Sequence, residues 1–205
     1  MKIVCTDLEG VLVPEIWINV AAQTGIKELR LTTRDIADYD ELMGYRLEIL
    51  DKHGLTLAAI QQVIAAMKPY DGALEFLEWL RSQTQVIVLS DTFTQFAGPL
   101  MAKLHWPTLF CNELAIDGQG MISGYTLRQA DGKRKAIEAL RSLNYRVIAM
   151  GDSYNDLSML AAAHAGILFR PPDSIRAEQP QFPVATTYDA LRDLLTSHLA
   201  AGPQD

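Results

Sequence analysis

Carboxylate and hydroxyl side chains follow three apolar, β-branched stretches of the sequence, at the point where each stretch ends. Residues 3–6 lead into the segment TDLEG, residues 85–90 lead into LSDT at 89–92, and residues 146–150 lead into GDSYND. Any one ending could simply cap a helix, because Asp and Ser are common at helix N-termini. Three such endings at one edge of one sheet would be much harder to explain by capping.

The elements around these endings predict a parallel α/β sheet. Short β-branched strands alternate with helical stretches, a pattern typical of parallel strands joined by right-handed crossovers. The predicted strands are 3–6, 85–90, 146–150, 166–169 and 183–186, with a strand–turn–strand over 109–127. The predicted helices are 14–25, 39–54, 56–67, 71–83, 94–104, 132–143, 154–163 and 188–199. Ligands of such sheets bind at the carboxyl ends of strands, where the three endings would meet.

Three of these acids predict a metal site. Asp7, Asp152 and Asp156 would bring several negative charges together, and close carboxylates repel unless a cation or shared protons neutralise them. Oxygen ligands on rigid turns favour Mg²⁺. Such a site, with a hydroxyl and a lysine nearby, suits a phosphoryl group, whose charge must be neutralised on all sides.

Composition narrows the class of protein. The 205 residues carry a net charge of −7, which argues against a nucleic-acid partner. The two cysteines, Cys5 and Cys111, lack disulfide-like or metal-like spacing, and Cys5 is expected to be a buried small hydrophobe. No signal peptide and no apolar run near the ~18 residues of a membrane span are recognisable. We therefore expect a cytoplasmic protein without a membrane partner, of unassigned oligomeric state.

Four segments together resemble the motifs of haloacid dehalogenase (HAD) superfamily phosphatases: Asp7-Leu-Glu-Gly-Val, Ser90 after VIVL, Asp-Gly-Lys133-Arg, and the segment GDSYND at 151–156. The resemblance covers nearly the whole chain and implies a HAD-like α/β core, residues 1–13 and 70–205, with a small helical cap, residues 14–69, inserted after the first strand. A cap at this place is similar to that of phosphoserine phosphatases. The segments DLEGVLVPEIW, TTRDI, LSDTF, GDSYND and HAGILF are most similar to the bifunctional phosphoserine phosphatase/homoserine phosphotransferase group.

The resemblance implies that Asp7 is the nucleophile, forming an aspartyl-phosphate, and also a metal ligand. Glu9 departs from the superfamily, which usually has Asp here as general acid/base. We expect Glu9 to keep that role, with its longer side chain folded back or approaching from another angle. The metal contact implied at this position is the backbone carbonyl of Glu9, which the substitution leaves in place.

The same resemblance implies a phosphate site. Ser90 would hydrogen-bond a phosphoryl oxygen together with the amides of Asp91 and Thr92, and the alternative for Ser90 is a plain helix N-cap. Lys133 would neutralise the phosphoryl group and the nucleophile. It is favoured over Arg134 and Lys135 because it stands at the helix start, and the alternative is an exposed lysine.

In the fourth segment, GDSYND, Asp152 is implied to ligate Mg²⁺ directly. Asp156 would act on the metal through water or would hold Lys133. Asn155 would fix the turn or touch the phosphate side. The alternative for the whole segment is a loop leading into a capped helix.

Within the cap, Glu15 and Arg46 match the residues that hold the ammonium and the carboxylate of phosphoserine. A zwitterionic amino acid requires one group of each sign in a closed site. Glu15 could instead be a helix-dipole residue, and Arg46 could lie on a solvated helix face.

Three functions therefore compete. The first is a Mg²⁺-dependent L-phosphoserine phosphatase with possible transfer to homoserine, and the second is a HAD phosphatase of another small phosphomonoester. The third, from a different class, is an inactive binding module on this fold, but such a module would be expected to lose Asp7, Lys133 or Asp152.

Overall fold

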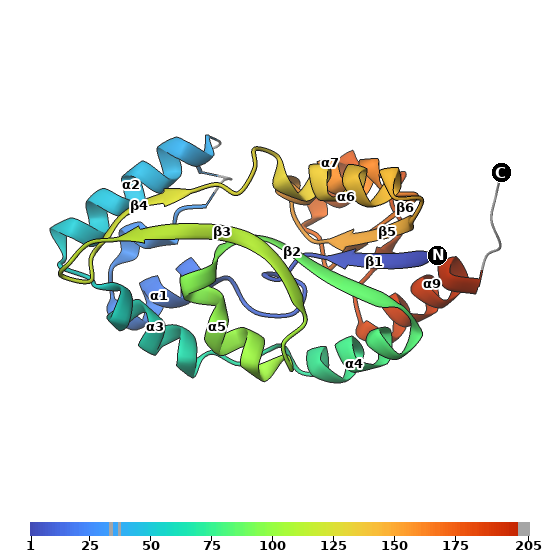
Figure 1. Ribbon diagram of the computed structural model, residues 1–205, viewed down its shortest axis with the longest axis horizontal. Coiled ribbons are helices and arrows are strands. Elements are labelled where there is room, and N and C mark those ends of the chain that lie inside the picture. Colours follow the sequence, from blue (N-terminus) through green and yellow to red (C-terminus); the bar gives the residue numbers. More distant parts are fainter. Residues whose placement is uncertain (33–34, 37, 201–205) are drawn as a thin grey trace.

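The computed structural model describes residues 1–200 apart from 33, 34 and 37 (Figure 1). Residues 33 and 34, part of the TTRDI segment quoted above, thus lie outside the described residues, as do residues 201–205. The described part forms a seven-stranded sheet in the order β4-β3-β2-β1-β5-β6-β7, in which neighbours are parallel except β3 and β4. The predicted α/β class is confirmed.

The elements follow the predicted alternation closely. The strands are β1 (Lys2–Thr6), β2 (Gln85–Phe93), β3 (Thr108–Ile116), β4 (Ile122–Thr126), β5 (Arg146–Gly151), β6 (Ala165–Phe169) and β7 (Val184–Ala185). The α-helices are α1 (Ile16–Thr24), α2 (Tyr39–Lys52), α3 (Leu57–Ala66), α4 (Ala73–Gln83), α5 (Thr94–Lys103), α6 (Gly132–Ser142), α7 (Leu157–Ala162), α8 (Asp173–Glu178) and α9 (Tyr188–Ala200). Two short 3₁₀ helices are η1 (Lys27–Arg30) and η2 (Tyr154–Asp156).

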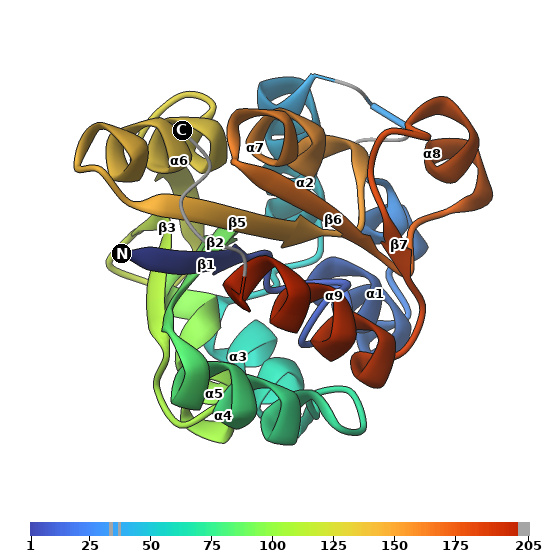
Figure 2. The ribbon, with the colours of Figure 1, turned by 90° about the vertical axis from the view of Figure 1, so that its right-hand side faces the viewer.

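Both faces of the central sheet are buried, which explains why its strands are apolar throughout. Side chains alternate along β1, so that Ile3 and Cys5 join one apolar cluster and Val4 joins the other. Figure 2 shows α6 and α7 over one face and α4 and α9 over the opposite face. Cys5 is fully buried, as expected from the sequence.

Three elements differ from the sequence prediction. Helices η1 and α8 were not predicted, and both are short enough to give little periodicity. Strand β2 does not end at Ser90 but continues to Phe93. Thr92 and Phe93 are buried, so the chain stays in the sheet layer beyond the predicted end.

The helices α1, α2 and α3 lie between β1 and α4 in the chain and form the left end of the molecule in Figure 1. Their apolar side chains belong to the same cluster as those of the sheet, and the Trp17 ring packs edge-on against Phe96 of α5 at 5.5 Å. The two connections to this region are tied together, since the Tyr70 amide donates to the Leu12 carbonyl at 3.0 Å. The division into a core and a cap at residues 13/14 and 69/70 stays a prediction.

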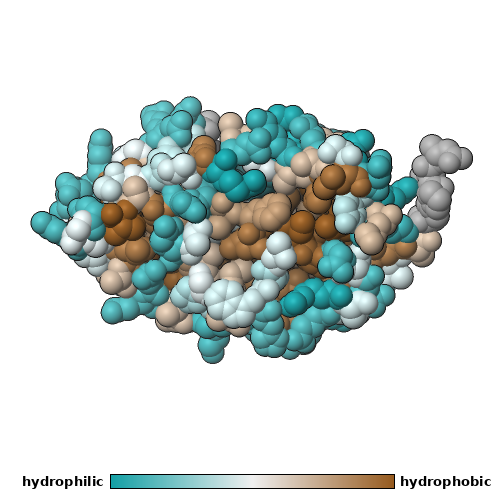
Figure 3. All heavy atoms as spheres, viewed as in Figure 1, coloured by the Kyte–Doolittle hydropathy of each residue, from teal (hydrophilic) through white to brown (hydrophobic). Residues whose placement is uncertain are grey.

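The surface seen in Figure 3 is mostly hydrophilic, with hydrophobic residues gathered near its middle beside β2 and β3. Among the described residues, no helix combines the length and the apolar character required to cross a bilayer.

Candidate active site

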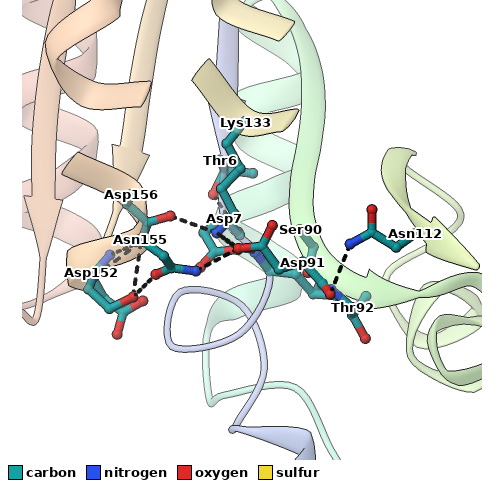
Figure 4. Close-up of polar contacts among 12 residues, drawn as sticks. Thr6, Asp7, Ser90, Asp91, Thr92, Asn112, Lys133, Asp152, Asn155 and Asp156 are labelled. Carbon is teal, nitrogen blue, oxygen red and sulfur yellow. Dashed lines mark hydrogen bonds and ion pairs between the residues drawn. The ribbon is translucent and has the colours of Figure 1, made fainter. Parts of the chain in front are cut away.

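The three acidic strand ends meet at one edge of the sheet. Strand β1 lies between β2 and β5, and the Asp7 amide continues the pairing by donating to the Met150 carbonyl at 3.0 Å. Figure 4 shows the residues that follow β1 and β5 lying together with residues 90–92 of β2, with Lys133 of α6 reaching into the group. The prediction that these strand ends share one site is therefore confirmed in the geometry.

Lys133 is the cation at the centre of this group. Its ammonium lies 2.9 Å from Asp7 Oδ1 and 2.7 Å from Asp156 Oδ1, and the side chain is buried. Although burial lowers the pKa of Lys133, the carboxylates of Asp156 and Asp7 raise it well above its usual value, so the lysine stays charged. The alternative of an exposed lysine is wrong. The neighbouring Arg134 instead pairs with Asp131 and Glu138 at the surface.

Asp7, Asp152 and Asp156 form the predicted acidic cluster. All three are buried, and each offers an oxygen within 4.8 Å of the others. Burial, and then the charge of Asp156, raises the pKa of Asp7, although the charge of Lys133 acts in the opposite direction. Three buried carboxylates with surplus negative charge fit a hard divalent cation.

Two glycines make this close packing possible. Gly10 has a φ of 77°, and a Cβ there would come within 2.3 Å of the Asp152 carboxyl group. A Cβ on Gly151 would come within 2.4 Å of the Asp156 carboxyl group. Any larger residue at these positions would displace a member of the acidic cluster.

Asp156 organises the loop that follows β5. Its Oδ2 accepts hydrogen bonds from the amides of Asp152 at 2.9 Å and Ser153 at 3.1 Å, while Oδ1 accepts from Lys133. Of the two roles predicted for Asp156, the geometry agrees with holding Lys133. Ser153 also caps η2, so the capped-helix interpretation of GDSYND is correct locally but does not exclude the acidic site.

The Ser90–Thr92 segment is a bulge in β2. Leu89 pairs with Phe110 and Phe93 pairs with Asn112, so residues 90–92 face only Cys111 of β3. The Ser90 hydroxyl oxygen accepts a hydrogen bond from the Thr92 amide at 3.2 Å. The proton of this hydroxyl group can therefore be donated to a ligand. Helix α5 is capped by Phe93, so the N-cap alternative for Ser90 is wrong.

The Asp91 carboxylate joins the β2 bulge to the loop after β5. It accepts from Asn155 Nδ2 at 2.8 Å and lies 3.7 Å from Lys133 Nζ. Of the two roles predicted for Asn155, the geometry agrees with fixing the loop. The sequence predicted a role only for the amide of Asp91, not for its carboxylate.

Glu9 contacts the N-terminus of helix α1 and lines the same cavity as Asp7. Its Oε2 accepts from the Ile16 amide at 2.8 Å, so it caps the helix from outside. Burial and the nearby Glu15 raise the pKa of Glu9 to about 8, which keeps the carboxyl group largely protonated at neutral pH. A protonated carboxyl group is a proton donor, as a general acid must be.

Glu15 and Arg46 line the same cavity, of about 1000 Å³, as the acidic cluster. Arg46 is 6% exposed, so the solvated-face alternative is wrong. Its guanidinium lies 4.6 Å from the centre of the Trp17 ring and donates to the Leu31 carbonyl at 2.9 Å. Its Nε is buried and has no hydrogen-bond partner among the described residues.

Several residues of this cavity were not predicted from the sequence. They come from elements far apart in the chain, and they include Tyr39, Tyr70, Asn112, Arg128 and Arg170. None belongs to a motif, although Arg128 and Arg170 directly follow predicted strands. The signal that could have indicated them is their position at the end of β6 or on elements that lie beside the strand ends.

A buried lysine and an acidic cluster at the carboxyl edge of a parallel sheet form the kind of site that a phosphoryl-transferring enzyme requires. Residues 1–164 match the haloacid dehalogenase-like hydrolase family. The chain belongs to this family.

Two relatives are similar over almost the whole chain. Phosphoserine phosphatase ThrH of Pseudomonas aeruginosa is 58% identical over 192 residues, covering 94% of each sequence. A phosphoserine phosphatase of Pseudomonas syringae pv. tomato is 57% identical, covering 94% of this chain and 81% of that protein.

Solved structures share the fold. A phosphoserine phosphatase in apo form superposes with a TM-score of 0.76 at 21% identity, covering 95% of this chain and 98% of that chain. A substrate-bound phosphoserine phosphatase complex also has a TM-score of 0.76, at 19% identity, covering 96% and 97%. At these identities the likeness establishes the architecture alone.

Proposed function

We propose that this protein is a phosphoserine phosphatase that hydrolyses L-phosphoserine to L-serine and phosphate through an aspartyl-phosphate. The observation that carries the proposal is the contact of Asp7 with Lys133 at 2.9 Å inside a buried acidic cluster. The two Pseudomonas phosphoserine phosphatases, 58% and 57% identical, support the choice of substrate.

In the first step, a carboxylate oxygen of Asp7 attacks phosphorus, and the bond from phosphorus to the serine oxygen breaks. Leu8 and Lys133 both donate to Asp7 Oδ1, at 2.7 and 2.9 Å, and thereby hold the carboxylate in one orientation. Glu9 gives its proton to the departing oxygen, consistent with its raised pKa.

In the second step, water attacks the phosphorus of the aspartyl-phosphate. Glu9, now ionised, takes the proton from water, and the bond from phosphorus to the Asp7 oxygen breaks. Phosphate leaves and Asp7 returns to its starting state. Throughout, the Ser90 hydroxyl, the amides of the β2 bulge and Lys133 would bind the phosphoryl oxygens.

The proposed cofactor is Mg²⁺, held by Asp7, Asp152 and the backbone carbonyl of Glu9, with Asp156 supporting the site through Lys133 or water. When bound, the cation supplies positive charge against the phosphoryl oxygens. The support is the donor set itself, three buried carboxylates whose oxygens lie within 4.8 Å of one another beside Lys133.

Substrate selection is assigned to the cap. Arg46 would bind the substrate carboxylate and Glu15 its ammonium group, since both line the cavity that contains Asp7. The buried, unpartnered Nε of Arg46 supports this role. A cytoplasmic location without membrane or nucleic-acid partners stays a prediction.

A cavity of about 1000 Å³ is generous for phosphoserine, at the upper end of typical ligand cavities. The space favours a second candidate activity, transfer of the phosphoryl group from Asp7 to the hydroxyl group of an acceptor such as homoserine. It equally leaves open hydrolysis of a different small phosphomonoester. An inactive module is disfavoured, because Asp7, Lys133 and Asp152 are all retained.

The test is phosphate release from L-phosphoserine with Mg²⁺, with and without homoserine. We expect release that requires Mg²⁺ and Asp7. A fall in phosphate release as homoserine phosphate appears would establish that one aspartyl-phosphate partitions between water and alcohol. No release at millimolar phosphoserine would contradict the proposed substrate and direct attention to other phosphomonoesters.

A further inference from the structure

The bulge in β2 leaves the Ser90–Thr92 segment, to which phosphoryl binding is assigned above, outside the regular hydrogen-bond ladder. Three residues, 90–92, stand opposite the single residue Cys111. Bulges of this kind redirect backbone groups, and they occur often beside active sites. Backbone groups that lose their ladder partners must be satisfied by other donors or acceptors, and those partners then determine the shape of the segment.

The carbonyl of Asp91 has two such partners, and both are side chains. Asn112 Nδ2 donates to it at 3.2 Å, and the Tyr39 hydroxyl donates to it at 3.2 Å. Asn112 belongs to β3, the strand beside the bulge, and Figure 4 shows its amide directed at this segment. Tyr39 comes instead from α2, a helix of the predicted cap. The same carbonyl is therefore held by the sheet and by the cap region.

Tyr39 is held at this position by the start of α2. It is the first residue of the helix, and the Asp38 side chain caps the helix by accepting from the Glu41 amide at 2.8 Å. The Tyr39 ring packs edge-on against Tyr125 of β4 at 6.0 Å. Burial raises the pKa of Tyr39, so its hydroxyl keeps its proton and acts as a donor.

A second tyrosine hydroxyl also connects α2 to the sheet, but it does not contact the Ser90–Thr92 bulge. Tyr125 on β4 donates to the carboxylate of Asp40, the second residue of α2. Each tyrosine thus connects α2 to the sheet through one hydroxyl, Tyr39 to β2 and Tyr125 from β4. They differ in that only Tyr39 reaches the residue next to Ser90.

We propose that Tyr39 is a positioning residue for the phosphate site: its hydrogen bond to the Asp91 carbonyl holds the Ser90–Thr92 bulge in shape only while α2 is docked on the β3–β4 hairpin. This inference rests on the proposed function, in which that bulge binds the phosphoryl group. It follows that α2 docking and phosphate binding favour each other, because each stabilises the same arrangement. In this role, Tyr39 contacts neither of the reacting atoms, which are the Asp7 carboxylate oxygen and phosphorus.

The experiment compares Tyr39→Phe with Tyr125→Phe as a matched control, because each variant loses one hydroxyl from the α2–sheet contact. Binding of inorganic phosphate to the full chain with Mg²⁺ is measured by calorimetry, and kcat and KM for phosphoserine are measured alongside. We expect Tyr39→Phe to weaken phosphate binding about 3- to 10-fold, the usual range for one lost hydrogen bond. Tyr125→Phe should change it less than about twofold.

A third variant links the two donors to the same carbonyl. Asn112→Ser shortens the other donor. The loss of phosphate affinity in a double variant with Tyr39→Phe should not equal the sum of the two single losses, because both donors bind the same carbonyl. Thermal unfolding of each variant identifies any loss of fold, so that a misfolded variant is not counted as evidence.

Equal losses of phosphate affinity in Tyr39→Phe and Tyr125→Phe would overturn the proposal, since docking of α2 alone would then explain both. Unchanged phosphate binding in Tyr39→Phe would overturn it as well. If Tyr39→Phe selectively weakens phosphate binding while phosphoserine is not hydrolysed, the positioning role stands and the proposed substrate fails. If the unaltered chain does not bind phosphate, both fail.

Discussion

The cavity contains two groups of acidic side chains that are held in different ways. Asp7, Asp152 and Asp156 follow strands of the sheet and share one buried lysine at 2.7–2.9 Å from two of them. Glu9 and Glu15 lie at the N-terminus of α1, and the nearby cation, Arg46, comes from another helix. The first group is fixed by backbone register, whereas the second depends on how helices pack.

The electrostatics of the two groups differ accordingly. In the strand-end group, burial and then the charge of Asp156 raise the pKa of Asp7, and the neighbouring carboxylates keep Lys133 charged, which suits a cation and a phosphoryl group. In the helix group, burial and Glu15 raise the pKa of Glu9 to about 8, which suits proton transfer. In the proposed function, the strand ends together with Lys133 of α6 would neutralise charge, and the side chains at α1 and α2 would serve proton transfer and substrate selection.

The largest expected effect is at the strand-end group. Asp7→Asn removes the nucleophile while keeping the size of the side chain, so turnover of phosphoserine should fall at least about 10⁴-fold. Steady-state phosphate release measures this, and unchanged thermal stability is the control. Residual turnover within tenfold of the unaltered chain would exclude Asp7 as nucleophile.

The next effect tests proton transfer in the helix group. Glu9→Gln keeps a group that can accept from the Ile16 amide but cannot exchange a proton, so kcat should fall about 10²- to 10⁴-fold. The KM for phosphoserine should change little. A Glu9→Gln enzyme with normal kcat would assign the acid/base role to another group.

A smaller effect should separate substrate selection from chemistry. Arg46→Met preserves packing over Trp17 but removes the charge, so KM for phosphoserine should rise about 10- to 100-fold. For p-nitrophenyl phosphate, which has no carboxylate, KM should rise less than about threefold. Equal increases for the two substrates would mean that Arg46 is structural.

The smallest effect concerns stability. Mg²⁺ at about 100 times its Kd should stabilise the chain by about 2.7 kcal/mol, roughly 5–10 °C in Tm. Calorimetry with Mg²⁺ or a chelator measures the shift. Asp152→Asn should lose most of the shift and Arg46→Met should keep it. The reverse result would place the cation in the helix group.

Much of the strand-end group could be predicted because it depends on local sequence. Apolar β-branched runs identify β1, β2 and β5, and parallel strands bring their carboxyl ends to one edge regardless of the connecting segments. Asp7, Ser90 and Asp152 are therefore adjacent by topology. Gly10 and Gly151 are explained only afterwards, by how closely the carboxylates pack.

The contacts between distant elements could not be predicted in this way. The sequence does not specify that Glu9 caps α1, that Arg46 is buried over Trp17, or that the Tyr39 hydroxyl reaches Asp91. Periodicity places a residue on a helix face, but not the distance of that face from a strand 52 residues away. The sequence by itself determined the order of strands and helices and the residues at the strand ends. Tertiary packing decided which side chains from the helices complete the site, because those distances depend on how the helices dock on the sheet.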